Sequence, residues 1–201
     1  MLSLTNTTPL KALLLSGIIS SALIGSSALA DWTINNETSA VQFVSIKNGS
    51  IGETHRFSQV SGTLSKAGAL TATITLGSVD TGIEIRDIRM KDVLFETPKF
   101  PSATITAQVA PAMLKSLKTG KSTNAQVPFE LDLHGQKVEL LADVIITQQK
   151  GGKLLVTTAS PILLNAAEFG LVDGINTLKT LAGLDSIATS VPVTVQLTLE
   201  Q

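Results

Sequence analysis

One short segment of the chain concentrates residues that could perform chemistry. Residues 77–87 (GSVDTGIEIRD) hold three carboxylates, Asp80, Glu84 and Asp87, beside one guanidinium, Arg86. A carboxylate can act as a general base, and an arginine can stabilise negative charge that develops during a reaction. The segment is therefore a candidate active site of a hydrolase or an isomerase.

The same spacing also fits a turn that ends a strand. Asp80 can accept hydrogen bonds from backbone N–H groups of the turn, and Gly82 can adopt a positive φ. The sequence has no Gly-x-Ser-x-Gly motif and no cysteine, and its two histidines, His55 and His134, do not form a helical metal-binding pair. We therefore predict a structural role for the segment, no catalytic residue and no metal site.

The elements that must position this segment are mostly β-strands. Apolar and polar residues alternate with a period of two, as in residues 70–76 (LTATITL) and 190–199 (SVPVTVQLTL). This alternation is typical of antiparallel strands with one buried face. We predict eight strands, over residues 40–47, 54–60, 70–76, 103–109, 124–133, 138–147, 154–163 and 190–199.

Turn residues and three helical patterns interrupt these strands. His134-Gly135 and Gly151-Gly152 each separate two strands, as in tight hairpins. The spacing of apolar residues predicts short helices near residues 83–95, 111–117 and 171–184. The pattern indicates one all-β domain, a sandwich or a closed barrel of about eight strands, with short helices.

The N-terminal segment is expected to be removed rather than folded. A polar region that contains Lys11 precedes an apolar stretch, residues 12–24, and Ala28-Leu29-Ala30 has small residues where a signal peptidase cleaves. The stretch is shorter than the roughly 20 residues of a membrane span. We interpret residues 1–30 as a cleaved secretory signal peptide and residues 31–201 as the mature domain, and the lack of cysteine is compatible with the periplasm.

Charge and composition argue against several classes of protein. The net charge is −1, and no run of Lys and Arg is present to attract nucleic acid or an anionic membrane. Aromatic residues make up 3% of the chain, too few for the aromatic girdles of a transmembrane barrel. The apolar strand faces are therefore expected to point inward, and the domain is not expected to span a membrane.

Many residues that are expected to point inward are small. Alanine and valine would leave space along a barrel axis, and apolar guests fill such space. Alternation does not measure volume, so a core filled by leucine is an equal alternative at this point. For a hollow interior, the predicted ligand-binding residues are Phe43, Phe57, Ala72, Ile74, Ala125, Val127, Phe129, Val191, Val193 and Val195.

Several motifs along the chain match a single family pattern. They are residues 78–82 (SVDTG), Arg86-Asp87, Met90, residues 92–95 (DVLF), residues 99–101 (KFP), residues 103–105 (ATI), and the flanking residues 43–62, 129–138 and 168–170. Together they resemble the YceI-like family of secreted bacterial proteins, also called a polyisoprenoid-binding, lipocalin-like family. The resemblance covers nearly all of residues 31–201. Members often carry a histidine in the first hairpin, where this chain has residues 46–48 (IKN).

The resemblance implies a closed antiparallel barrel of lipocalin type, capped by a helix, that holds a long lipid chain. The expected function is that of a periplasmic carrier that binds a polyisoprenoid, a quinone or a fatty-acyl chain without covalent attachment and without another cofactor. The protein is expected to be a monomer or a homodimer. Two alternatives stay open: a lipid-modifying hydrolase or isomerase that uses Asp80, Arg86 or His55, and a stress-related interaction protein with a filled core.

Overall fold

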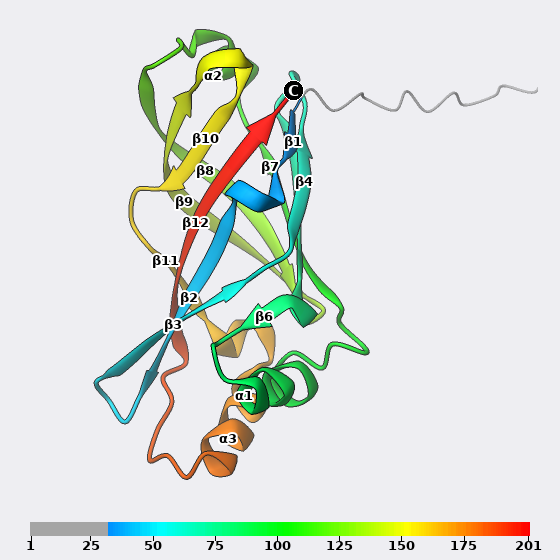
Figure 1. The fold of residues 1–201 in the computed structure, drawn as a ribbon, viewed down its shortest axis with the longest axis vertical. Helices are drawn as coiled ribbons and strands as arrows, with labels where there is room; N and C mark the ends of the chain where they lie inside the picture. The colour runs from blue at the N-terminus through cyan, green and yellow to red at the C-terminus, as the bar shows by residue number, and fades with distance from the viewer. Residues whose placement is uncertain (1–31) are drawn as a thin grey trace, which may run out of the picture.

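The chain forms a barrel of antiparallel strands with helices across its lower end (Figure 1). The computed structural model describes residues 32–201, so the predicted signal peptide, residues 1–30, lies outside the described part. The strands are β1 Trp32–Ile34, β2 Ala40–Lys47, β3 Ile51–Phe57, β4 Val60–Leu64, β5 Ala69–Thr75, β6 Val79–Asp80, β7 Ser102–Gln108, β8 Ser122–Leu133, β9 Gln136–Gln148, β10 Leu154–Thr158, β11 Ile162–Asn165 and β12 Ser190–Glu200.

Eight of these strands form a closed ring. They follow the order β1-β4-β5-β7-β8-β9-β10-β12, and β12 pairs back with β1. Below the ring, β2 and β11 lie on the two sides of β12, β3 pairs with β2, and β6 pairs with β3. All of these pairs are antiparallel, so the predicted closed antiparallel barrel of about eight strands is confirmed and the sandwich is not formed.

Two predicted strands differ from the observed ones. The strand predicted at residues 54–60 is β3, which ends at Phe57, and a separate β4 follows from Val60. Gly62 and two hydroxyl residues obscure the alternation in β4 (VSGTL). The strand predicted at residues 154–163 is divided into β10 and β11, because Pro161 has no N–H to donate to a neighbouring strand.

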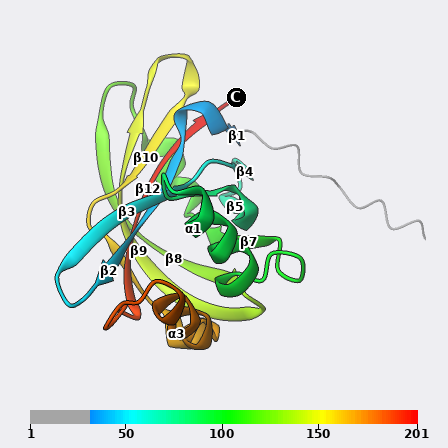
Figure 2. The same cartoon turned by 60° about the horizontal axis from the view of Figure 1, so that its bottom comes forward.

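The three predicted helical segments are present. They are α1 Glu84–Arg89, which continues into the π-helical turn η3 Met90–Leu94, then α2 Pro111–Ser116 and α3 Val172–Leu181. The structure also contains short 3₁₀ turns, which are η1 Asn36–Thr38, η2 Leu76–Ser78, η4 Lys150–Gly152 and η5 Ala166–Phe169. Figure 2, in which the lower end comes forward, shows α1 and α3 at that end of the barrel. α3 packs against η3, and Gly174 allows this contact, because a Cβ atom there would lie 2.9 Å from the carbonyl oxygen of Val93.

The interior of the barrel is packed with side chains in its upper part and contains a cavity in its lower part. Trp32, Leu64, Leu154 and Leu199 are buried where β1, β4, β10 and β12 meet, and Trp32 Nε1 donates to the Gly152 carbonyl at 2.8 Å. In the lower part, side chains of the strands face those of α1, η3 and α3 across a cavity. Within residues 32–201, no helix is long and apolar enough to cross a bilayer.

Candidate ligand-binding cavity

The lower part of the barrel encloses a cavity of about 420 Å³. This volume lies within the range of about 300–1,000 Å³ that is typical of small-molecule sites. All but six of its lining side chains are apolar, and they come both from the strands and from the helical cap. Among them are Phe43 and Phe57 from the β2–β3 hairpin, Phe95 after η3, and Phe169 of η5. The alternative of a core filled by its own side chains therefore does not describe the lower barrel.

Seven of the ten predicted ligand-binding residues line this cavity. They are Phe43, Phe57, Ile74, Phe129, Val191, Val193 and Val195. Their contact with a ligand stays a prediction, but the fold brings all seven side chains to one apolar space.

The other three predicted residues do not line the cavity. Ala72 is buried in the packed interior, with its backbone paired to Gly62 and Ile105. Ala125 and Val127 lie on the upper half of β8 and are only half-buried. Further down the same strand, Phe129 reaches the cavity, because the barrel is hollow only beside the cap.

The expected origin of the hollow is supported only in part. Of the small residues that were expected to create the space, Val191 and Val193 border it, whereas Ala72 and Ala125 do not. Most of the wall consists of phenylalanine, leucine and isoleucine. The cavity lies between the lower strands and the helical segments α1, η3 and α3.

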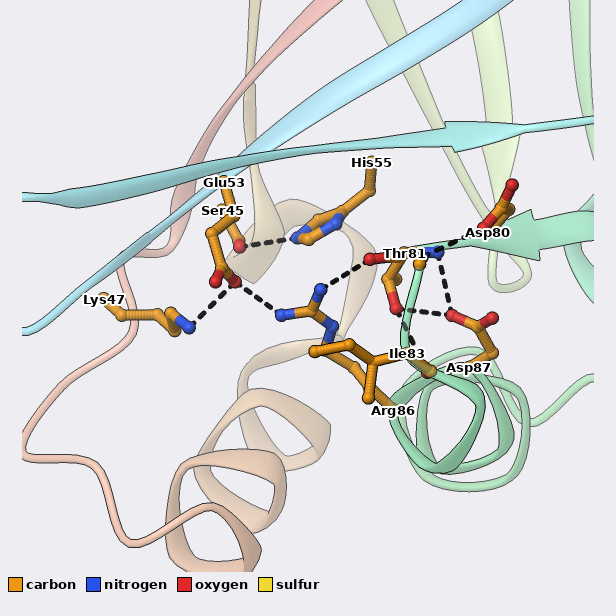
Figure 3. A network of polar contacts seen from close by, with 10 residues as sticks. Ser45, Lys47, Glu53, His55, Asp80, Thr81, Ile83, Arg86 and Asp87 are labelled. Carbon is orange, nitrogen blue, oxygen red and sulfur yellow. Dashed lines mark hydrogen bonds and ion pairs between the residues drawn. The ribbon is translucent and has the colours of Figure 1, made fainter.

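The six polar side chains of the lining come from the β2–β3 hairpin and from α1. They are Ser45, Lys47, Glu53, His55, Arg86 and Arg89. Figure 3 shows the first five of them together at the contact between the hairpin and the helix. The cavity therefore has a polar end and an otherwise apolar wall.

Glu53 connects the two elements that form this polar end. Its Oε2 atom lies 2.8 Å from Lys47 Nζ and 2.5 Å from Arg86 Nη1 (Figure 3). The hydrogen bond from Lys47 lowers the pKa of Glu53, Arg86 lowers it further, and partial burial opposes both effects. Glu53 is therefore a stable carboxylate that holds α1 against β3.

His55 is the most deeply buried polar residue of the site, with 3% of its surface exposed. Its Nε2 atom lies 2.8 Å from Ser45 Oγ, and its ring packs against Phe43 with 5.1 Å between centroids. Burial is the main cause that lowers the pKa of His55, and the positive charge of Arg86 adds to it. Nδ1 is buried and has no hydrogen-bond partner within residues 32–201.

The candidate catalytic segment, residues 77–87, forms a turn between β6 and α1. Asp80 Oδ1 accepts from the Gly82 N–H at 3.0 Å, and Gly82 has a φ of +73°, so the predicted cap is present. Asp87 Oδ1 accepts from Thr81 N and Oγ1 at 2.9 and 2.5 Å, while Arg86 Nη2 donates to the Thr81 carbonyl at 2.7 Å. Arg86 also lines the cavity.

Asp80 does not join His55 and Arg86 at the cavity. Its Oδ2 atom accepts from Arg56 on the outer side of β3, at 2.7 Å from Nη2. The second histidine, His134, is bound to Glu96 and the Phe169 carbonyl at the lower end of the barrel. In the described part of the chain, no group of three or more His, Asp or Glu side chains is placed to bind a metal ion.

Sequence reasoning missed Ser45, Lys47 and Glu53. A signal for them exists, because β2 and β3 pair with Ser45 opposite Glu53 and Phe43 opposite His55. Side chains two residues apart share a face of a strand. Once Phe43 is assigned to the inner face, Ser45 and Lys47 follow on the same face.

Comparison with known proteins identifies relatives of this fold. The family model of the YceI-like domain matches residues 32–199. A solved structure of a polyisoprenoid binding domain from Saccharophagus degradans, implicated in plant cell wall breakdown, is 37% identical, with a TM-score of 0.82 over 85% of this chain and 98% of that chain. No curated protein sequence matches the chain.

Two more distant structures share the fold. Burkholderia cenocepacia BcnA is 16% identical, with a TM-score of 0.62 over 82% of this chain and 98% of that one. The Campylobacter jejuni YCEI protein is 18% identical, with a TM-score of 0.53 over 73% and 84% of the two chains.

Proposed function

Because the chain belongs to the YceI-like domain family, we propose that its barrel carries a lipid, with the lipid's long apolar chain in the cavity. The single observation that carries the proposal is the 420 Å³ cavity, whose wall is apolar apart from six side chains at one end. The similarity to a polyisoprenoid binding domain at 37% identity supports an isoprenoid as the ligand.

Apolar burial supplies the affinity in this proposal. Each methylene removed from water contributes about 0.8 kcal/mol. A prenyl chain of about 20 carbons gains on the order of 10 kcal/mol before the cost of ordering chain and cap is subtracted. No catalytic group is needed for this function.

We further propose that the carrier acts in the periplasm. This localisation rests on the signal-like sequence of residues 1–30, in which an apolar stretch precedes Ala28-Leu29-Ala30. N-terminal sequencing of protein from its own host tests it, and a mature N-terminus at Asp31 is expected.

Native mass spectrometry of protein purified from its own host tests the carrier proposal. We expect a species heavier than the polypeptide by one lipid, which organic extraction releases. Protein of bare polypeptide mass that also fails to take up added geranylgeraniol would contradict it.

One observation favours a second candidate, a lipid ester hydrolase. Ser45 Oγ lies 2.8 Å from His55 Nε2, which is the arrangement of a nucleophile and a general base. Against it, the lowered pKa weakens His55 as a base, and no group orients Nδ1 in residues 32–201. Turnover of a long-chain p-nitrophenyl ester that Ser45→Ala abolishes would establish this function, and equal rates in both proteins would exclude Ser45 as the nucleophile.

A further inference from the structure

We propose that the polar end of the cavity binds an oxyanion head group, a carboxylate or a phosphate, at the end of the bound lipid. This inference rests on the proposed carrier function and specifies the ligand class that the same cavity selects. It is carried by the charges, by the hydrogen-bond donors and by their enclosure between the hairpin and α1.

Positive charge exceeds negative charge along the cavity wall. Lys47, Arg86 and Arg89 are its cations, and Glu53 is its one carboxylate within residues 32–201. Asp87, which follows Arg86 in α1, is bound to Thr81 and does not border the cavity. Two positive charges therefore remain without a balancing carboxylate in the lining.

Hydrogen-bond donors are also in excess at this end. The ammonium of Lys47 has three N–H groups, and its ion pair with Glu53 uses one of them. Both Lys47 and Arg86 share the same oxygen, Oε2, of Glu53. Since this carboxylate already serves two cations, Lys47 retains donors for an oxygen from another molecule.

Two buried nitrogen atoms point to an incomplete site. Arg86 Nε and His55 Nδ1 have no hydrogen-bond partner in the described chain, although both are enclosed by protein atoms. Buried polar atoms in folded proteins are nearly always paired. A ligand oxygen that enters between the hairpin and α1 would give the Nε–H of Arg86 an acceptor.

The apolar surroundings explain why an anion is preferred to a neutral head group. Charges interact more strongly in an apolar site than in water, and they are screened less by salt. A neutral hydroxyl would accept one hydrogen bond but leave the two unbalanced charges. A carboxylate or a phosphate would satisfy both the charges and the donors.

Three ligands with the same prenyl chain test the inference. Geranylgeranoic acid, geranylgeranyl phosphate and geranylgeraniol are titrated by displacement of an apolar fluorescent dye from the purified protein. We expect at least one anion to bind about tenfold more tightly than the alcohol, which is the effect of one charge-assisted hydrogen bond. The tighter anion shows whether the head group is a carboxylate or a phosphate.

Two variants are expected to change the affinity for this anion in opposite directions. Lys47→Met removes a hydrogen-bond donor and a positive charge, so it is expected to weaken the binding of the anion about tenfold. Glu53→Gln removes the competing carboxylate and is expected to increase the affinity for the anion. This second variant tests the inference independently if Lys47→Met folds poorly. Lys121→Met, in an exposed loop away from the cavity, is the matched control and leaves the affinity unchanged.

The outcomes separate this inference from the carrier proposal. If geranylgeraniol binds saturably and as tightly as both anions do, the head-group inference is overturned and the carrier function is left intact. An equal loss of affinity for all three ligands in Lys47→Met also overturns it, because such a loss reflects general damage to the cavity. If none of the three ligands binds, both proposals fail.

Discussion

His134 and Glu96 meet at the lower end of the barrel, with 2.9 Å between Nε2 and Oε2, and both residues have a positive φ. Such values are uncommon outside glycine. His134 and Gly135, with φ of 55° and 75°, form the two-residue turn between β8 and β9, which suits a turn that requires positive φ at both positions. The other ring nitrogen, Nδ1, lies 3.2 Å from the Phe169 carbonyl oxygen. One imidazole therefore ties this turn to the segment after η3 and to η5.

We expect His134→Asn to destabilise the protein by about 1–2 kcal/mol, because the hydrogen bonds of the ring are lost. Asparagine tolerates a positive φ, so the turn itself is preserved. Urea unfolding measures the difference. Glu96→Gln keeps an oxygen acceptor and is expected to lower the free energy of unfolding by less. An unchanged urea midpoint in His134→Asn would show that the imidazole does not tie these segments together.

Filling the cavity should abolish much of the lipid binding without loss of the fold. Val193 borders the cavity and pairs with Phe43, so the ring of Val193→Phe enters the hollow. Displacement of about two methylenes of the ligand weakens binding about tenfold. Dye displacement gives the affinity, and circular dichroism verifies the fold.

The matched control for this variant is the next residue of β12. Thr194 is exposed and points to the opposite face of the strand. Thr194→Phe is therefore expected to bind lipid as the unchanged protein does. Equal binding by Val193→Phe and the unchanged protein would place the lipid elsewhere.

Mild acid should lower the stability of the protein through His55. Burial lowers the pKa of His55 below the ordinary value of 6.5. Between the two pKa values the unfolded chain binds a proton that the folded protein does not, so the free energy of unfolding decreases as the pH falls below about 6.5. The slope from this one group is at most about 1.4 kcal/mol per pH unit, and it ends at the pKa of the folded state.

Urea unfolding at pH 7, 6 and 5 measures this dependence. His55→Gln lacks the titrating group and is expected to show a shallower decrease than the unchanged protein. The lowered pKa of Glu53 acts below its ordinary value of 4.5, so it does not contribute in this pH range. Identical slopes for the two proteins would contradict the prediction.

Asp87 should matter more for stability than Asp80. Asp87 accepts two hydrogen bonds from Thr81, which is 9% exposed, so Asp87→Ala is expected to cost about 2 kcal/mol. Asp80 accepts from the Gly82 N–H and pairs with Arg56, but both contacts are exposed to water, where they contribute less, so the loss in Asp80→Ala is expected to be smaller. Denaturant midpoints of both variants test the order, and the reverse order would contradict the assigned roles.

Much of the fold could be predicted from local patterns. Alternation located β2 at residues 40–47, and it located β8, β9 and β12 within two residues of their observed ends. The structural role of residues 80–82 was also predictable, because an aspartate and a glycine two residues apart form a turn through their own backbone groups. These features depend on neighbours in the sequence.

The cavity and its polar end depend on contacts between distant residues. Val127 and Phe129 have the same alternation on β8, yet only Phe129 borders the cavity, since periodicity identifies a strand face and not a height along the barrel. Arg86 reaches Glu53 only because α1 folds back beneath the β2–β3 hairpin, 33 residues away along the chain. The sequence by itself determined the strands, the turns and the inward apolar faces. Tertiary structure alone decided where the interior stays hollow and which charges face it, because volume and charge proximity result from long-range packing.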